Sequence, residues 1–534
     1  MYKRLIASFS TLVLLLCILT ARLALLSTAD TLSQAATQQS TFTLDISSTR
    51  GRIYDFALRP LTGRNGAWRA AVLPCAQSSA VLLRAMPPEE RPALLRQIET
   101  LMPFVCTVPT DALYARGIDV FWIPQRCTDV QTALHLIGGL DAATGHGASG
   151  LEKAYDQLLT SAGGTLRMRY STDALRRPIP GESPEVLNSG YHTGAGLVLT
   201  LDRDIQELAE RAAASIQKGA VVVMDPYTGN IKASVSRPTY NPNDMSTALN
   251  SSDSPFINRA FYAYPVGSTM KVLTACSALE QGVPPSRTFC CEGSVEVGNV
   301  IFRCHNLSGH NLLDMTGALA HSCNPYFITL ALQIGGPTLL FKASQLGFGC
   351  AAELAPGMRT QPGTLPTPKE LIAPAATANF GFGQGILTAT PLQIASLVSA
   401  MANGGGAITP RLVEGTTTDG KTFASHTATY AAVPVFAPAA ARMVRDMMIS
   451  VVEQGSGTTA TPRHGGAGGK TASAQTGRFV DGVEEVHAWF SGFYPAKNPQ
   501  YTIVVLVEGG DSGSEAACPV FKAIADGLDA LHLN

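Results

Sequence analysis

The chain has 534 residues, of which 46% are hydrophobic and 15% are charged, and its formal net charge is −1. A chain of this length has enough material for about three domains and a large hydrophobic core. The near-zero charge argues against nucleic-acid binding, because contact with phosphates needs an excess of basic residues. It also argues against long disordered regions, which combine few apolar residues with a high net charge.

The N-terminus has a short basic segment followed by an apolar one. Met1-Tyr2-Lys3-Arg4 precedes an uncharged run from Leu5 to Ala21. This run is at the short end of the roughly 17–25 residues that cross a bilayer. Basic residues before the span predict a cytoplasmic tip and an extracytoplasmic remainder. We therefore predict a tip and membrane anchor over residues 1–29. A cleaved signal peptide, cut near Ser27-Thr28-Ala29, is the alternative, and it also exports the rest of the chain.

The remaining chain divides into two regions. Residues 30–195 are rich in loops and contain one amphipathic helix, predicted over 89–102. From residue 196 onwards, strands are predicted near both ends and helices between them. The predicted strands are 197–201, 220–225, 230–236, 489–494 and 501–508, and the predicted helices are 203–218, 271–281, 313–334, 391–403 and 437–454. This order predicts an α+β domain over 196–534, whose sheet is closed by hairpins distant in sequence.

The first candidate for chemistry is a serine at the start of a predicted helix. Gly267 favours a turn, and Ser268 and Lys271 then share one helix face. A serine hydroxyl becomes a nucleophile when a neighbouring base takes its proton. A lysine can be that base when burial or a second cation lowers its pKa. Ser215 and Lys218 repeat this spacing without a preceding turn, and we interpret them as solvated surface.

Two further motifs supply groups that such a site needs. Ser322-Cys323-Asn324 precedes a helical stretch, and its hydroxyl and amide can relay a proton and hold a substrate amide. Lys470-Thr471-Ala472-Ser473 lies just before the last hairpin and offers a cation and two hydroxyls that could clamp a carboxylate. Taken singly, the first motif is typical of a helix cap and the second of an exposed strand. Their occurrence together, in this order, favours one composite site.

The three motifs resemble the Ser-x-x-Lys, Ser-x-Asn and Lys-Thr-Gly signatures of the penicillin-binding protein and serine β-lactamase superfamily. Other segments resemble class B penicillin-binding proteins, the monofunctional D,D-transpeptidases of the bacterial cell wall. These segments are Arg50-Gly51-Arg52-Ile53-Tyr54-Asp55, Gly150-Leu151-Glu152-Lys153-Ala154-Tyr155-Asp156, Thr200-Leu201-Asp202 with Gln206, Gly383-Gln384-Gly385 and Thr390-Pro391-Leu392-Gln393. The resemblance implies a penicillin-binding/serine β-lactamase-like transpeptidase domain at 196–534. It also implies a pedestal or dimerisation-type module at 30–195 and a single transmembrane helix.

The resemblance implies a catalytic role for five residues. Ser268 would attack the penultimate D-Ala carbonyl of a peptidoglycan stem peptide, and Lys271 would be its general base. Ser322 and Asn324 would complete the proton network. Lys470 would lower the pKa of Lys271 by like-charge repulsion. β-Lactam antibiotics would acylate the same serine, and no cofactor is implied.

Substrate binding is assigned in the same way. Thr471 and the Ser473 hydroxyl would bind the terminal carboxylate, and the backbone N–H groups of Ser268 and Ser473 would form the oxyanion hole. Ala472 departs from the family pattern, which has glycine there because substrate passes close to the strand. A single methyl group is the smallest possible intrusion, so we interpret Ala472 as a tolerated variant.

Several alternative functions fit the sequence less well. A class A β-lactamase would need a Glu-x-x-x-Asn pattern between residues 324 and 470, and the sequence has none. A β-lactam sensor would normally need further membrane spans, and a bifunctional enzyme would need a glycosyltransferase domain before residue 196. A non-catalytic scaffold of the cell-wall machinery is the remaining binding-protein alternative. The family usually works beside a SEDS-type glycan polymerase, which is the partner that we expect.

The chain has 11 cysteines, many for an exported protein. It has no pair of CxxC units and no HExxH, so the pattern predicts no metal site. Cys276 and Cys323 lie in apolar stretches, which favours buried free thiols.

A disulfide is predicted between the first two motifs. Val295 to Phe302 reads as a hairpin with Gly298-Asn299 as its turn, which brings Cys291 opposite Arg303 to Asn306. This register predicts a cross-strand disulfide to Cys304, and related extracytoplasmic proteins favour Cys291 over Cys290 as the partner. Free thiols in an anaerobic organism are the alternative.

Overall fold

The computed structural model describes residues 2–27, 40–173, 175, 177–179, 181–191, 193–425, 432–480 and 482–533. Helix α1 (Tyr2–Ser27) is long and apolar enough to cross a membrane, by its length and composition. It is the one such helix in the described ranges, as the sequence predicts. The boundary between residues 29 and 30, and Thr28 and Ala29 of the alternative cleavage site, lie outside the described residues.

The chain forms two compact units that are interleaved in sequence. Unit 1 comprises Met1–Arg50, Asn65–Gln125 and Ser161–Thr193, and unit 2 comprises Gly51–Arg64, Arg126–Thr160 and Gly194–Asn534. Unit 2 therefore takes two segments from the region 30–195. The assignment of 30–195 as a pedestal module and of 196–534 as the transpeptidase domain stays a prediction.

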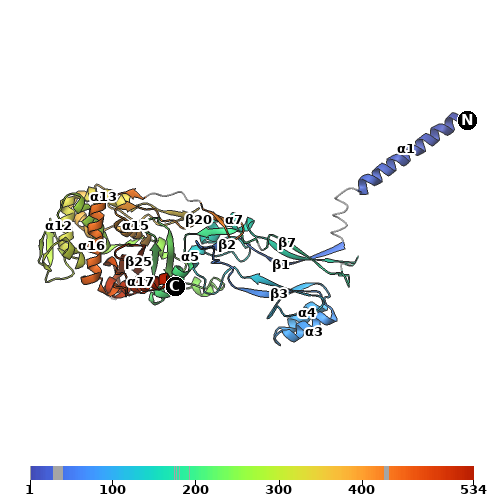
Figure 1. Ribbon diagram of the computed structural model, residues 1–534, viewed down its shortest axis with the longest axis horizontal. Coiled ribbons are helices and arrows are strands. Elements are labelled where there is room, and N and C mark those ends of the chain that lie inside the picture. The colour runs from blue at the N-terminus through green and yellow to red at the C-terminus, as the bar shows by residue number, and fades with distance from the viewer. Residues whose placement is uncertain are drawn as a thin grey trace. The chain divides into compact units, whose positions relative to one another are not determined.

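Unit 1 contains two antiparallel sheets of three strands, drawn in blue to cyan-green in Figure 1. The first has the order β1 (Thr41–Ser48), β6 (Thr165–Ser171), β7 (Glu185–Ser189), and the second the order β4 (Phe104–Val108), β3 (Gly66–Val72), β5 (Ile118–Pro124). Helices α3 (Ala76–Ala85) and α4 (Arg91–Glu99) pack on the second sheet through Leu82 and Leu94. The helix predicted over 89–102 is thus present and is shorter than expected.

The centre of unit 2 is a five-stranded sheet whose neighbouring strands are all antiparallel. Its order is β10 (Ile231–Arg237), β9 (Gly219–Met224), β25 (Tyr501–Val507), β24 (Val483–Tyr494), β23 (Gly468–Val480). Both predicted hairpins, β9–β10 and β24–β25, are confirmed. At the first turn the Asp225 carboxylate accepts the N–H groups of Tyr227 and Thr228, and Gly229 takes a φ of 73°. The expected α+β fold with an antiparallel sheet is therefore present.

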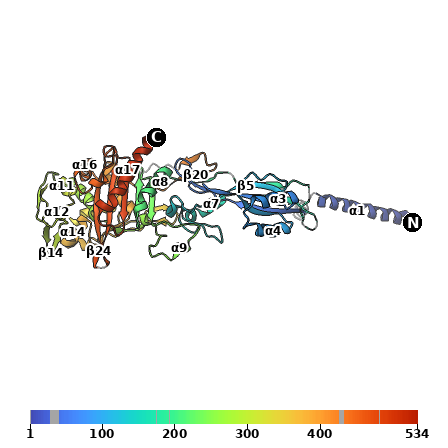
Figure 2. The same cartoon turned by 90° about the horizontal axis from the view of Figure 1, so that it is seen from below.

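Both faces of this sheet are buried, which explains why its central strands are continuously apolar. On β9, Val222 packs into the larger core cluster and Val221 into a second one. The second cluster is covered by α8 (Arg203–Ala212) and α17 (Cys518–Leu533), which lie side by side in Figure 2. The larger cluster is covered by α10 (Lys271–Glu280), α12 (Asn324–Ile334), α15 (Pro391–Ala402) and α16 (Pro438–Gln454).

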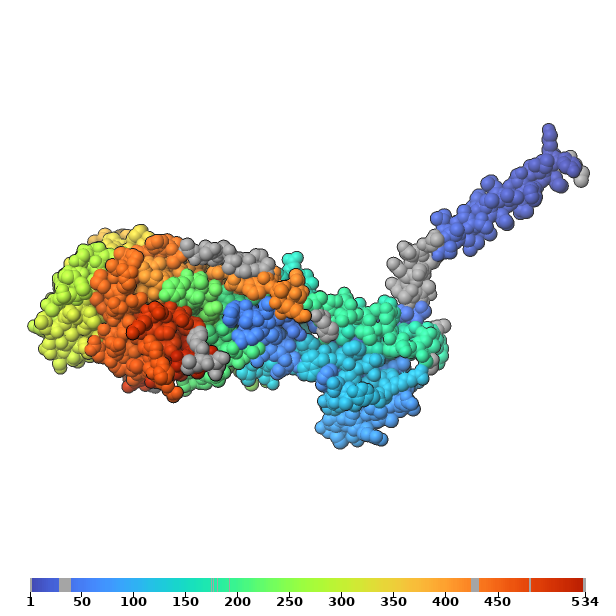
Figure 3. Space-filling view, viewed as in Figure 1, coloured from blue at the N-terminus to red at the C-terminus, as the bar shows by residue number. Residues whose placement is uncertain are grey.

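Helices that are distant in sequence lie together near β23, the edge strand of the central sheet. Helix α11 (Met315–Ala320) packs against α16, and α16 packs against β23. In Figure 3 the yellow-green surface of α11 and α12 accordingly lies beside the orange surface of α16. This arrangement brings the ends of α11 and α12 close to the edge strand of the central sheet.

Shorter elements complete unit 2. A four-stranded sheet has the order β2 (Arg52–Tyr54), β8 (Gly196–Leu199), β20 (Val413–Thr417), β21 (Phe423–Ser425). Two-stranded pairs are β11 (Tyr264–Pro265) with β18 (Thr388–Ala389), β12 (Phe289–Cys291) with β15 (Asn311–Leu313), β13 (Ser294–Val297) with β14 (Val300–Arg303), β16 (Glu353–Ala355) with β17 (Met358–Arg359), and β19 (Gly406–Ala407) with β22 (Val433–Pro434). The remaining α-helices are α5 (Leu134–Ile137), α6 (Gly150–Ala154), α7 (Asp156–Ser161), α9 (Ser246–Leu249), α13 (Gly336–Gln345) and α14 (Pro374–Phe382).

Candidate functional site: a serine beside two buried lysines

The candidate nucleophile lies in a tight turn between β11 and α10. Gly267–Met270 form one 3₁₀ turn, and Ser268 is half-buried at its start. Gly267 has a φ of 56°, a conformation that glycine adopts without strain. Gly383 also allows a close approach here, because a Cβ at that position would lie 1.8 Å from the Gly267 carbonyl oxygen. The Gly-Gln-Gly segment therefore packs directly on the nucleophile turn.

Lys271, the first residue of α10, is fully buried. Its Nζ donates hydrogen bonds to the Ser322 carbonyl oxygen at 2.7 Å, the Ser322 hydroxyl at 3.1 Å and Asn324 Oδ1 at 2.7 Å. Burial lowers the pKa of Lys271 to about 7, against a smaller opposing effect of the thiols of Cys323 and Cys304. A substantial fraction of this lysine is therefore neutral at physiological pH and able to accept a proton.

Ser322 lies in a break between α11 and α12, where the sequence pattern predicts one helix over 313–334. That prediction is wrong at this point, because Ser322 takes a φ of 54° and Cys323 becomes the N-cap of α12. Asn324 is held on both sides, since its Nδ2 donates to the Arg303 carbonyl oxygen at 3.0 Å. The break turns the Ser322 hydroxyl towards the lysines, which a continuous helix would not do.

Lys470, on edge strand β23, is the second fully buried lysine. Its Nζ donates to the Ser322 hydroxyl at 2.9 Å and to the Thr471 carbonyl oxygen at 2.8 Å. The pKa of Lys470 lies well below its usual value, first through burial and then through repulsion by Lys271. The expected repulsion thus acts on Lys470, whereas burial is what lowers the pKa of Lys271.

Thr471 and Ser473 share one face of β23, and Ala472 is on the other. Thr471 is 6% exposed and Ser473 is exposed. Ala472 is 3% exposed and belongs to the larger core cluster, so its methyl group is packed among apolar side chains. The Thr471 hydroxyl also contacts the hydroxyl of Ser456 at 2.6 Å. Sequence reasoning missed Ser456, because a lone serine between two glycines carries no recognisable signal.

This arrangement can move a proton between a nucleophile, the Lys271 amine and the Ser322 hydroxyl. A neutral Lys271 can take a proton from a nucleophile, and the Ser322 hydroxyl can carry one onwards because it contacts both lysine nitrogens. With Ser268 as nucleophile, the site can perform acyl transfer through a covalent serine ester.

A second cluster adjoins this site and was not predicted. The ligand atoms of Cys291, Cys304, His310 and Cys323 all lie within 4.8 Å of one another. Zn–S bonds of about 2.3 Å hold tetrahedral sulfur ligands about 3.8 Å apart, and Cys₃His is a known structural zinc set. The hydrogen bond between the two thiols lowers the pKa of Cys304 and raises the pKa of Cys323, so Cys304 is the first of the pair to become the thiolate that binds metal. The four residues therefore fit a Zn²⁺ ion. Their wide spacing explains why a search for CxxC pairs fails to find them.

The predicted hairpin before this cluster is confirmed, because Val297 pairs with Val300 and Ser294 with Arg303. The predicted disulfide is not formed, since Cys291 and Cys304 are both free cysteines. Cys323 and Cys276 are buried free thiols, as expected. Cys304 faces His310 and Cys323 as well as Cys291. The thiol of Cys304 therefore has three neighbours, where the hairpin register predicts one.

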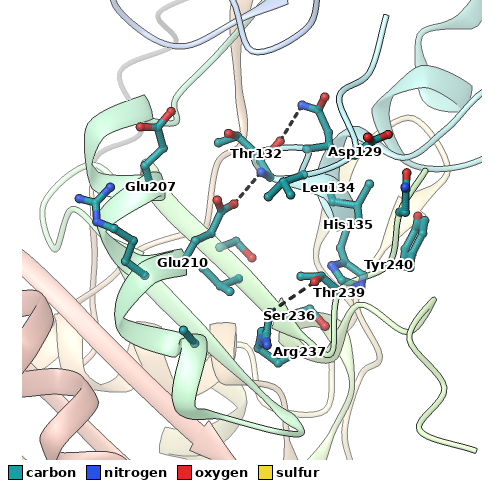
Figure 4. A pocket seen from close by; sticks show the side chains of 18 residues that line it. Asp129, Thr132, Leu134, His135, Glu207, Glu210, Ser236, Arg237, Thr239 and Tyr240 are labelled. Atoms are coloured by element: carbon teal, nitrogen blue, oxygen red, sulfur yellow. Dashed lines mark hydrogen bonds between the residues drawn. The ribbon is translucent and has the colours of Figure 1, made fainter. Parts of the chain in front are cut away.

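A separate cavity of about 590 Å³ lies between α8, β10 and the loop before α5. Figure 4 shows Glu210 reaching from α8 to the backbone N–H of the residue before Leu134, a contact of 2.8 Å. His135 and Tyr240 line the opposite wall. None of the predicted catalytic or substrate-binding residues lines this cavity.

Two known proteins are similar in sequence to most of this chain. The stage V sporulation protein D of Bacillus subtilis is 30% identical over 420 residues, which cover 75% of this chain and 63% of that protein. The peptidoglycan D,D-transpeptidase MrdA of Acinetobacter baumannii is 30% identical over 404 residues, covering 70% of this chain and 58% of that protein. The chain thus spans about three fifths of the length of these relatives.

A solved structure of similar fold is the complex between penicillin-binding protein PBP2 and MreC from Helicobacter pylori. The alignment has a TM-score of 0.66 at 22% identity and covers 92% of this chain and 99% of that chain. The family described as the penicillin binding protein transpeptidase domain matches residues 219–526, which include all eight of the motif residues discussed above. More than half of the chain lies in that match, so the chain belongs to the penicillin-binding protein transpeptidase family, as its resemblance to the class B members predicts.

Proposed function

We propose that this protein is a peptidoglycan D,D-transpeptidase that crosslinks stem peptides through an acyl-enzyme on Ser268. The observation that carries the proposal is the Ser322 hydroxyl, which accepts hydrogen bonds from two fully buried lysines. Surface serines and lysines do not form such a pair, because burying an ammonium group is costly unless the site has a use for it.

In the acylation step, the Ser268 hydroxyl oxygen bonds to the carbonyl carbon of the penultimate D-Ala, and its proton passes to Lys271. The bond to the nitrogen of the terminal D-Ala then breaks. That nitrogen receives the proton through the Ser322 hydroxyl, so D-Ala leaves as a neutral amine. Backbone N–H groups of Ser268 and Ser473 stabilise the developing oxyanion, and such donors contribute about 2.7–4 kcal/mol each.

In the second step, an amine of a neighbouring stem peptide attacks the serine ester. Its proton passes to Lys271, the ester C–O bond breaks, and Ser268 regains a proton. The new amide bond is the crosslink. Thr471 and the Ser473 hydroxyl bind the terminal carboxylate of the donor peptide, and β-lactams acylate Ser268 by the same route.

We place the catalytic domain outside the cytoplasm, anchored by α1. The basic residues before α1 support this orientation. A SEDS-type glycan polymerase is the expected partner, and the complex of a PBP2 with MreC suggests a second component of the cell-wall machinery.

The experiment that tests this proposal is labelling of the full chain in detergent with fluorescent penicillin. We expect one adduct on the peptide that contains Ser268 and none in Ser268→Ala. Slow release of the label distinguishes a transpeptidase from a β-lactamase, which hydrolyses it rapidly. Equal labelling of wild type and Ser268→Ala would refute the assignment, and no labelling of either would favour a non-catalytic scaffold.

We also propose that Cys291, Cys304, His310 and Cys323 hold a structural Zn²⁺ ion. The complete four-residue donor set supports this, because structural zinc sites have no open position. When bound, zinc would supply a crosslink between the hairpin region and the start of α12. Cys323 lies between Ser322 and Asn324, so this crosslink would hold the backbone of both motif residues in place.

A further inference from the structure

Ser456 lies in the loop after α16, where it contacts three other segments of unit 2. Its hydroxyl oxygen is 2.6 Å from that of Thr471 on β23. Its backbone N–H donates to the Ala320 carbonyl oxygen at 2.9 Å, two residues before Ser322. Its carbonyl oxygen accepts from the Ser514 hydroxyl at 2.7 Å. Ser456 is therefore connected to the Ser-x-Asn segment, to the Lys-Thr strand and to the loop before α17.

These contacts leave Ser456 little freedom. Both of its backbone groups have protein partners, and the preceding residue, Gly455, packs so closely that a Cβ there would lie 2.4 Å from the Ala320 oxygen. The side-chain hydroxyl is thus held against Thr471 by a fixed backbone. A hydroxyl held in this way is preorganised for one contact.

The direction of the hydrogen bond decides what Thr471 can do. A threonine hydroxyl has one proton, and if Thr471 donates it to Ser456, none remains for a ligand. If Ser456 donates instead, the Thr471 proton is free to point into the cleft. Lys470 Nζ, 3.5 Å from the Thr471 hydroxyl oxygen, can only be a donor when charged. An anionic ligand favours the second arrangement, because charge-assisted hydrogen bonds are the stronger ones.

We propose that Ser456 is a positioning residue for carboxylate recognition: it donates to Thr471 and so directs the Thr471 proton towards the terminal carboxylate of the donor peptide. This proposal rests on the proposed function, because it needs Thr471 to bind that carboxylate. Ser456 acts through Thr471 and does not itself contact the reacting atoms. A purely structural role in the loop would instead slow reactions of every substrate equally.

The experiment compares two acyl donors on the full chain in detergent. One is a small D,D-thiolester with a free terminal carboxylate, and the other is the same thiolester with that carboxylate converted to an amide. We expect Ser456→Ala to lower kcat/KM for the free acid about tenfold and to change kcat/KM for the amide less than twofold. Because both donors react with the same preparation, the ratio does not depend on the fraction of folded protein.

Two further variants complete the test. Ser456→Thr keeps a hydroxyl and should restore the preference for the free acid to within about threefold. Thr459→Val is the matched control, because the Thr459 hydroxyl is in the same loop and donates to the Ser514 carbonyl oxygen at 2.6 Å without contacting Thr471. It should leave the preference unchanged. Equal losses on both donors in Ser456→Ala would overturn the role of Ser456, whereas no acylation of wild type would overturn the proposed function itself.

Discussion

At the scale of single residues, the chemistry of the site depends on where two ammonium groups are placed. Lys271 and Lys470 are both fully buried, and neither forms a salt bridge in the described chain. Burial without a counter-ion disfavours the charged form of lysine. The hydrogen bonds to Ser322 and Asn324 keep the amines oriented whether or not they are protonated.

The first prediction concerns the pH dependence of acylation. Burial lowers the pKa of Lys271 to about 7, and the neutral amine is the form that accepts a proton. The acylation rate constant should therefore rise with pH up to about 7 and level off above it. At one pH unit below that pKa, the rate should be about tenfold lower than at the plateau. Stopped-flow measurement of penicillin acylation between pH 5 and 9 checks this.

Lys271→Ala is the companion variant. It should slow acylation by more than a hundredfold on the plateau above pH 7, since general-base catalysis contributes about 10²–10⁴-fold, and by less at lower pH, where Lys271 of wild type is protonated. Circular dichroism and thermal melting show whether the variant remains folded. An unchanged pH profile in a variant that still acylates at near wild-type rate would remove Lys271 from the role of base.

The second prediction concerns Ala472→Gly, which restores the usual family residue. The Ala472 methyl group is buried in the core cluster, so its removal should cost about 0.8 kcal/mol of packing. Glycine in a strand costs roughly a further 0.5–1 kcal/mol in backbone entropy. We therefore expect lower thermal stability and an acylation rate within about threefold of wild type. A tenfold faster acylation would show instead that the methyl group obstructs the substrate.

At the scale of elements, the regular hairpins, the apolar helices and the helix start near Pro325 could be predicted from sequence, and the left-handed conformation of Ser322 could not. The β9–β10 hairpin has an apolar run, a turn and a returning strand in order, and each carries a local signal. The start of α12 also has a local signal, because Pro325 lies in its first turn, but nothing in the local sequence marks the positive φ of Ser322, whose partners Lys271 and Lys470 are distant in sequence. The sequence identifies the motif residues by their type and order. It does not show that the Ser322 hydroxyl lies between the amines of Lys271 and Lys470.

The same limit explains the misplaced cysteine prediction. The hairpin register correctly brought Cys304 near Cys291, but the other two ligands come from elsewhere: His310 directly precedes β15, and Cys323 is the N-cap of α12. Only tertiary packing adds these two ligands. The pairing of two strands brings two cysteines together and so suggests a disulfide. Four converging ligand atoms suggest a metal site.

The third prediction tests this metal centre. Purified full-length protein should contain about one zinc per chain by mass spectrometry, and prolonged chelation should lower its melting temperature. Cys291→Ser should lose the metal and at least about 3 kcal/mol of stability, the value for a hundredfold excess of free metal over its Kd. Cys290→Ser is the matched control, because the neighbouring Cys290 is exposed and lies outside the cluster. A Cys291–Cys304 disulfide in non-reducing peptide maps would overturn the metal assignment.

At the scale of the whole molecule, two segments that the sequence analysis placed in the region 30–195, namely Gly51–Arg64 and Arg126–Thr160, belong to unit 2. Strands β2 and β8, both of unit 2, pair in parallel, although two of the three segments of unit 1 lie between them in sequence. Arg126 binds Glu152 at 2.5 Å and the Gly51 carbonyl oxygen at 2.7 Å, which ties both early segments together. Such pairings depend on long-range contacts, so composition along the chain does not reveal them. They do give a physical reason for the Arg-Gly and Gly-Leu-Glu segments.

The last prediction concerns the membrane. If α1 is an uncleaved anchor with its basic end in the cytoplasm, the chain should stay in the membrane fraction after alkaline carbonate extraction, whereas a cleaved chain would be released. Cys350 is an exposed cysteine of unit 2, so it reports which side of the membrane that unit occupies. A membrane-impermeant maleimide should label Cys350 in intact spheroplasts, and Cys350→Ser should lose that labelled peptide. Labelling of Cys350 only after lysis would place the catalytic unit in the cytoplasm, where peptidoglycan strands are absent, and would overturn the proposed orientation.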